Sequence, residues 1–188
     1  SGTTGNPKGV MLTHRNLIAN ITAILQAAKL SQDDNETFLS FLPLSHILER
    51  MGGHFTTFSI GATVYFAESL ETVAENLVET KPTVALCVPR LFEKIYNKIM
   101  SGLSEASAIK KKMFFAAIET GRKINNLPKG ESIPFSLSVK HKIFDKLIYS
   151  KVRDKLGGNI RFFISGGAPL SKEIAEFFSY LDIIILEG

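Results

Sequence analysis

Short apolar segments alternate with longer amphipathic segments along the chain, and this alternation constrains the fold more than any other feature of the sequence. The short segments are rich in β-branched and aromatic residues and are expected to be strands, at residues 37–42, 62–67, 83–88, 160–164 and 182–186. Helices are expected between them, over 14–30, from the turn at 43–45 to 59, and over 70–80, 90–100, 104–125, 136–156 and 171–180. Strands that are linked through helices pair in parallel, with helices on both faces of the sheet. The predicted fold class is therefore α/β.

Several helix ends carry recognisable signals. Thr13 and Ser171 each stand just before an apolar helical pattern and are expected to cap those helices at their N-termini. Pro89 suits a first helical turn. Gly157 and Gly158 are expected to end the helix over 136–156.

Composition limits the kind of protein. A chain of 188 residues with 45% hydrophobic residues can bury one sizeable core. No apolar run reaches the ~18–20 residues of a membrane-spanning helix. The single cysteine, Cys87, has no disulfide partner within the chain, which favours a reducing compartment such as the cytoplasm. Because Cys87 lies in an apolar run, we expect a small buried side chain rather than a catalytic thiol.

The positive charge is concentrated in one segment. The net charge is +4, yet residues 108–155 hold 12 Lys or Arg against 4 Asp or Glu. This segment carries no base-reading motif, so we expect no nucleic-acid partner. On the helix over 136–156 a polar stripe is expected, formed by Lys142, Lys146, Tyr149 and Arg153, with Ile143, Phe144, Leu147, Ile148 and Val152 on the opposite arc. The simpler interpretation is the solvated face of a surface helix; the alternative is a patch that faces anionic lipid headgroups.

The first nine residues have the composition of a phosphate-binding loop. Three glycines let backbone N–H groups approach phosphate oxygens, the hydroxyl groups add donors, and a lysine adds positive charge. The spacing differs from that of the common phosphate loop, because Gly9 follows the lysine. No Gly-x-Gly-x-x-Gly is present. A surface turn is the alternative interpretation. The candidate phosphate-binding residues are Ser1, Gly2, Thr3, Thr4, Gly5, Asn6, Pro7 and Lys8.

Two more candidate sites follow expected strands. His46 comes just after the first strand, where open α/β sheets place their ligands. Ser165-Gly166-Gly167-Ala168-Pro169 follows the strand at 160–164, and its glycines permit close approach by a ligand. An ordinary strand-to-helix turn explains this segment equally well.

Four segments, in order, resemble the motifs of the adenylate-forming superfamily, which includes acyl-CoA synthetases, luciferases and peptide-synthetase adenylation domains. They are Ser1–Val10, Leu42–His46, Ser165–Leu170 and Leu186–Gly188. Pro43-Leu-Ser-His-Ile, followed by Glu49-Arg50, is most similar to the long-chain fatty acid–CoA ligases. The resemblance implies that residues 1–188 are a single partial AMP-binding domain, with a basic helical segment at 104–156. It also implies an internal part of the large N-terminal domain of a longer enzyme, cut at both ends.

The resemblance further implies a reaction and its participants. A fatty acid would react with ATP and Mg²⁺ to give an acyl adenylate and pyrophosphate, and coenzyme A would then displace AMP. The first eight residues would hold the pyrophosphate, and His46 would orient the substrate. Adenine would lie against Gly166, Gly167, Ala168 and Pro169, and Glu187 and Gly188 would continue that wall. The chain by itself is expected to be inactive, since the family's catalytic lysine has no counterpart here. A cytoplasmic protein with peripheral membrane contact through helix 136–156 is expected, and the residues give no expectation about the oligomeric state.

Three alternatives stay open from the sequence. One is an AMP-forming ligase or adenylation domain with an aryl or amino acid substrate. A second is a non-catalytic nucleotide- or lipid-binding module. A third is a phosphotransferase that uses the same loop and releases ADP.

Overall fold

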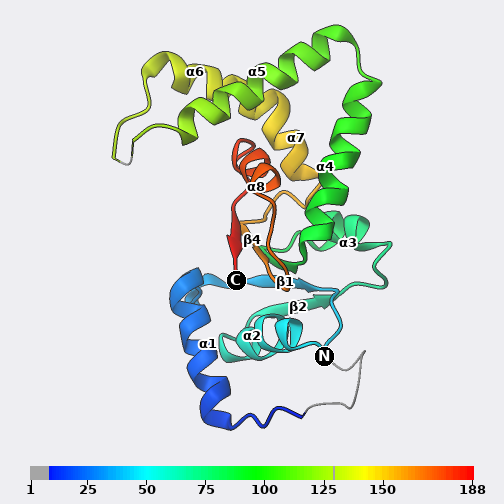
Figure 1. Cartoon of the computed structure of the whole chain (residues 1–188), viewed down its shortest axis with the longest axis vertical. Coiled ribbons are helices and arrows are strands. Elements are labelled where there is room, and N and C mark those ends of the chain that lie inside the picture. Colours follow the sequence, from blue (N-terminus) through cyan, green and yellow to red (C-terminus); the bar gives the residue numbers. More distant parts are fainter. Residues whose placement is uncertain (1–8, 129) are drawn as a thin grey trace.

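The computed structural model describes residues 9–128 and 130–188, and its centre is a five-stranded sheet (Figure 1). The strands are β1 (Thr37–Ser40), β2 (Thr63–Phe66), β3 (Val84–Cys87), β4 (Phe162–Ser165) and β5 (Ile185–Glu187). They lie in the order β2-β1-β3-β4-β5, and every neighbouring pair is parallel. The predicted α/β class and the five expected strands are therefore confirmed, although the strand ends differ by a few residues.

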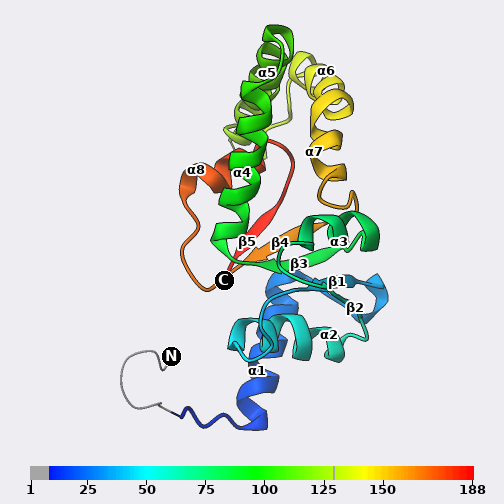
Figure 2. The same cartoon turned by 90° about the vertical axis from the view of Figure 1, so that its right-hand side faces the viewer.

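Helices cover both faces of the sheet (Figure 2). One face carries α1 (His14–Ala28), the π-helix η2 (Glu49–Phe55) and α2 (Thr56–Ser59). The short 3₁₀ turn η1 (Gln32–Asp34) lies between α1 and β1 in the chain. The other face carries α3 (Val73–Thr80), α4 (Pro89–Ser104) and α8 (Lys172–Ser179). Because side chains alternate along a strand, β1, β3 and β4 each contribute to two cores. Phe38, Val84 and Phe162 pack in the first core, and Leu39, Ala85 and Phe163 pack in the second.

The expected helix ends are confirmed where the structure describes them. The Thr13 side chain accepts a hydrogen bond from the Asn16 N–H, and the Ser171 side chain accepts one from the Ile174 N–H. Pro89 opens α4. Gly157 and Gly158 end the helical stretch with φ angles of 99° and 78°, in the region that favours glycine.

A helical lobe, formed by the chain between α4 and β4, extends away from the sheet (Figure 1). It consists of α5 (Ala108–Asn125), α6 (Phe135–Phe144), the π-helix η3 (Asp145–Tyr149) and α7 (Ser150–Asp154). The Tyr149 hydroxyl donates to the Ala117 carbonyl oxygen at 2.6 Å and joins the lobe's two long helical segments.

Tyr149 corrects the expected polar stripe. Its side chain is fully buried, whereas Ile143 and Leu147, expected on the core-facing arc, are exposed. The prediction was wrong here because both arcs of this helix carry apolar side chains. Helical periodicity separates two arcs but does not say which one faces the core.

Candidate functional site

The loops that leave β1 and β4 meet at the carboxyl edge of the sheet. Leu48, two residues after His46, packs against Gly166 in the loop after β4. A Cβ built on Gly166 would lie 2.8 Å from Leu48 Cδ1, well inside the ~3.5–4.0 Å separation of packed carbon atoms. Gly166 therefore allows close approach by the segment that carries His46. The next residue, Gly167, has a φ of 83°, which a side chain would strain.

Backbone hydrogen bonds attach the neighbouring segments to this edge. The Gly166 N–H donates to the Cys87 carbonyl oxygen at 3.1 Å, and the Gly188 N–H donates to the Ser165 carbonyl oxygen at 3.0 Å. Gly167, Ala168 and Pro169 are exposed, as are Glu187 and Gly188. The two segments that were expected to contact adenine thus lie next to each other on an open surface.

His46 is held in a tight turn at the same edge. Its N–H donates to the Pro43 carbonyl oxygen at 2.9 Å, and the Arg50 Nε–H donates to the Leu44 carbonyl oxygen at 2.9 Å. The Leu48 N–H donates to His46 Nδ1 at 3.2 Å. Because Nδ1 accepts, the proton of the neutral ring lies on Nε2. The exposed imidazole therefore offers an N–H donor from a fixed backbone turn.

Glu49 follows this turn and lies inside the protein. It is 1% exposed, and its Oε1 accepts a hydrogen bond from the Ser40 Oγ at 2.5 Å, at the carboxyl end of β1. Oε2 has no hydrogen-bond partner among the described residues. Burial raises the pKa of Glu49 above its ordinary value, and the hydrogen bond from Ser40 opposes that rise. A Cβ on Gly53 would collide with this carboxyl group, so Gly53 leaves the room that Glu49 occupies.

Glu49 begins the π-helix η2, which continues directly from the His46 turn. π-helical turns are rare and are frequently found at functional sites. Glu49 is not among the site residues that the sequence predicts. Two features of the sequence could have pointed to Glu49. It stands three residues after His46, and the pair Gly52-Gly53 follows it.

Cys87 ends β3 beneath this edge and is fully buried, as expected. Burial raises the pKa of its thiol well above the ordinary value, and the charge of Glu49 raises it further. The thiol therefore stays protonated, and Cys87 acts as a small apolar side chain.

Comparison with known proteins identifies the family. Residues 1–187 match the family described as AMP-binding enzyme. The chain belongs to this AMP-binding enzyme family.

Two relatives are fatty acid-activating enzymes by name. The chain is 41% identical to a long-chain-fatty-acid–CoA ligase of Homo sapiens, over 100% of this chain and 28% of that protein. It is 37% identical to the peroxisomal long chain acyl-CoA synthetase 6 of Arabidopsis thaliana, over 94% of this chain and 24% of that protein. The chain thus spans about a quarter of the length of these relatives.

Similarity to a solved structure gives evidence about the fold only. The N-terminal domain of FACL13 from Mycobacterium tuberculosis, solved with an inhibitor bound, matches 100% of this chain and 34% of that chain. The TM-score is 0.60 and the sequence identity is 17%. The likeness shows that this chain has the fold found in that N-terminal domain.

Of the expected site residues, Gly166 to Pro169 lie beside Glu187 and Gly188, and Leu48, two residues after His46, packs against Gly166. The expected phosphate-binding residues Ser1 to Lys8 lie outside the described residues. Within residues 9–128 and 130–188, no three His, Cys, Asp or Glu side chains are grouped as a metal site would need. In the same ranges no helix is long and apolar enough to cross a membrane.

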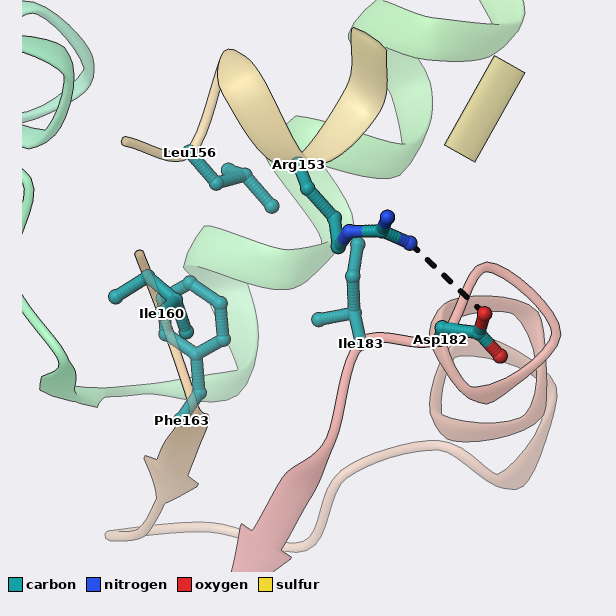
Figure 3. Close-up of a pocket in the computed structure, with 6 residues that line it drawn as sticks. All are labelled: Arg153, Leu156, Ile160, Phe163, Asp182 and Ile183. Atoms are coloured by element: carbon teal, nitrogen blue, oxygen red, sulfur yellow. Dashed lines mark ion pairs between the residues drawn. The ribbon is translucent and has the colours of Figure 1, made fainter. Parts of the chain in front are cut away.

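The cavity drawn in Figure 3 lies elsewhere on this AMP-binding enzyme domain. Arg153, Leu156, Ile160, Phe163, Asp182 and Ile183 line it, at the ends of β4 and β5 that are opposite His46. Arg153 Nη1 lies 3.9 Å from Asp182 Oδ2 across it, and Asp182 also pairs with His141 at 2.9 Å. These contacts connect the helical lobe to the turn before β5 and lie at the opposite edge of the sheet from the candidate site.

Proposed function

We propose that the complete protein activates a long-chain fatty acid with ATP and transfers the acyl group to coenzyme A. The proposal rests mainly on the similarity to long-chain acyl-CoA ligases over the whole of this chain. Membership of the AMP-binding enzyme family and the polar edge around His46 support it. Because the chain spans only 28% and 24% of those relatives, activity and substrates are proposed for the whole protein.

In the first step a carboxylate oxygen of the fatty acid attacks the α-phosphorus of ATP. A bond forms between that oxygen and phosphorus, and the bond from phosphorus to the bridging oxygen of pyrophosphate breaks. The products are an acyl adenylate and pyrophosphate. Two anions approach each other in this step, so catalysis depends on positioning and on neutralising charge.

We assign the pyrophosphate to residues Ser1–Lys8, since their glycine N–H groups, hydroxyls and Lys8 supply donors and positive charge. Mg²⁺ would enter bound to phosphate oxygens of ATP. The described residues do not form a protein site for this ion, and none of the steps proposed here depends on one.

His46 is proposed to orient the reacting carboxylate. Its Nε2–H is the free donor, and the turn around Pro43 fixes its direction. Such a donor stabilises a carboxylate and the charge that develops near the α-phosphate. Adenine is proposed to lie against Gly167, Ala168 and Pro169, beside Glu187 and Gly188.

In the second step the sulfur of coenzyme A attacks the acyl carbon, and AMP leaves with the electrons of the acyl–oxygen bond. Residues beyond those described are proposed to complete this half-reaction. A cytoplasmic location is also proposed, and the buried, protonated thiol of Cys87 is compatible with it.

The test is product analysis with the complete protein, using palmitate, benzoate and an amino acid as alternative acids. We expect AMP and pyrophosphate with palmitate. Release of ADP would indicate a phosphotransferase, and activity with benzoate alone would indicate another branch of acid–thiol ligases. ATP binding with no turnover of any acid would indicate a non-catalytic module.

His46→Ala should slow adenylate formation ~10–100-fold, the size of a lost positioned donor, while ATP affinity changes little. The matched control is His141→Ala, which removes an imidazole from the opposite edge of the sheet. Equal loss of ATP affinity and adenylation in His46→Ala would contradict the orienting role, and so would equal effects of the two variants.

A further inference from the structure

The helical lobe exposes a row of large apolar side chains. Phe135, Val139, Ile143 and Leu147 are 86%, 40%, 52% and 41% exposed. They are spaced four residues apart along α6 and η3, so they lie along one side of the helix. Such a row is unusual on a surface helix, where the outward face is normally polar.

The opposite arc of the same helix already packs in the protein. Phe144, Ile148 and Tyr149 belong to or pack against the core that includes Phe114 and Ala117 of α5. The exposed row therefore does not serve to attach the helix to the lobe. Nothing in residues 9–128 or 130–188 covers it.

Lysines border the row on both sides. At about 100° per residue, Lys142 and Lys146 lie on one side of the row. Lys140 lies on the other side, and Lys151 follows the row in the first turn of α7. All four are exposed, and none makes an ion pair with a described residue. The only acidic residue between positions 135 and 151 is Asp145, which pairs with Arg153.

A surface with an apolar row and lysines along both margins can bind where a polar phase meets an apolar one. The apolar side chains enter the acyl region, while lysine stems lie along it and keep their ammonium groups at the headgroups. Each lysine near an anionic leaflet contributes ~1 kcal/mol. A protein partner would need an apolar groove with acidic margins on both sides, whereas an anionic membrane offers both properties along any direction.

We propose that α6 and η3 form a docking surface for an anionic phospholipid membrane, with Phe135, Val139, Ile143 and Leu147 in contact with the acyl chains. We call these four residues and their four bordering lysines the lobe face. Figures 1 and 2 place α6 at the far end of the molecule from α1 and away from Gly188, so docking leaves the His46 edge open. The proposal does not depend on nucleotide chemistry, and a vesicle-binding experiment without ATP tests it separately from the proposed function.

The experiment measures binding of the complete protein to sedimented vesicles, without nucleotide. One vesicle type contains phosphatidylcholine with 30 mol% phosphatidylserine, and the other contains phosphatidylcholine only. Lys142→Ala/Lys146→Ala should lower the partition coefficient onto the anionic vesicles about 30-fold, from ~1 kcal/mol per lysine. Ile143→Ser/Leu147→Ser should lower it at least about tenfold, since two exposed apolar side chains lose their contact with lipid.

Matched controls change the same residue types elsewhere. Lys94→Ala/Lys98→Ala removes two exposed lysines with the same spacing on α4, and Ile18→Ser removes an exposed isoleucine on α1. Neither control should change binding more than about twofold. Because the changed residues are exposed, all variants should keep the parent melting temperature. The two lobe-face variants change different residue types, so they test the lysines and the apolar row separately.

Several results would overturn the proposal. One is that the parent protein does not bind the anionic vesicles. Another is that it binds both vesicle types equally, and a third is that the control variants lose as much vesicle binding as the lobe-face variants. A lobe-face variant that keeps vesicle binding but changes the oligomeric state would overturn it too, because it would assign the row to a second copy of the protein.

Discussion

Replacing Gly166 with alanine tests whether the loops after β1 and β4 act as one site. The new Cβ would lie 2.8 Å from Leu48 Cδ1 and 3.2 Å from Cδ2. Packed carbon atoms sit ~3.5–4.0 Å apart, so the two loops must separate by about 1 Å or Leu48 must change rotamer. Overpacking of this kind costs ~1–3 kcal/mol.

The same displacement should also slow catalysis. Leu48 is two residues from His46 and its backbone N–H donates to the His46 ring, so separation of the two loops displaces that N–H and moves the imidazole. A misplacement of about 1 Å can cost ~10²-fold in rate. We expect acid-dependent pyrophosphate release by Gly166→Ala to fall ~10–100-fold, while the free energy of unfolding falls by no more than ~3 kcal/mol.

Two variants make the measurement decisive. Leu48→Ala removes the colliding methyl groups. The fold loss in rate of Gly166→Ala/Leu48→Ala should therefore be smaller than the product of the fold losses of the two single variants. Gly102→Ala in α4 is the control, because nothing lies within 4 Å of its added Cβ. Full activity of Gly166→Ala, or a loss that Leu48→Ala does not relieve, would refute the reasoning.

Two further predictions concern buried groups. The raised pKa of Glu49 means that the folded state holds the proton more tightly than the unfolded state. The contribution of Glu49 to the free energy of unfolding is therefore fully present below the ordinary pKa of 4.5. It falls as pH rises toward the folded pKa, by ~1.4 kcal/mol for each pH unit between the two values. Glu49→Gln should lessen this fall in melts from pH 4 to 8, and an unchanged slope would show that Glu49 is not its source. Burial raises the pKa of Tyr149 to about 12, so its hydroxyl stays protonated and keeps donating to Ala117; Tyr149→Phe should lower the free energy of unfolding by ~0.5–1.5 kcal/mol in urea titrations, and no loss would deny that bond a net role.

Much of the fold follows from local sequence patterns. The alternation of strand and helix segments predicted the parallel sheet, and Thr13 and Ser171 predicted two helix starts, because caps depend on neighbouring residues only. The π-helix η2 was not predicted. Its geometry depends on Glu49 reaching Ser40 and on Gly53 leaving room, which are contacts of the folded chain.

The candidate site divides in the same way. His46 and Gly166 were selected from short motifs, but nothing in those motifs indicates that Leu48 packs against Gly166. The orientation of α6 and η3 was mistaken for a related reason. Ile143 and Tyr149 are both apolar in bulk, and only the contact of Tyr149 with Ala117 determines which of them is buried.

Transfer of oxygen from the acid to AMP tests the central claim most directly. The complete protein would receive palmitate labelled with ¹⁸O in its carboxylate, together with ATP and coenzyme A. Attack of that carboxylate on the α-phosphorus predicts one ¹⁸O atom in the phosphate of AMP and none in pyrophosphate, seen by mass spectrometry. Unlabelled AMP, or label in any other phosphate, would contradict the account.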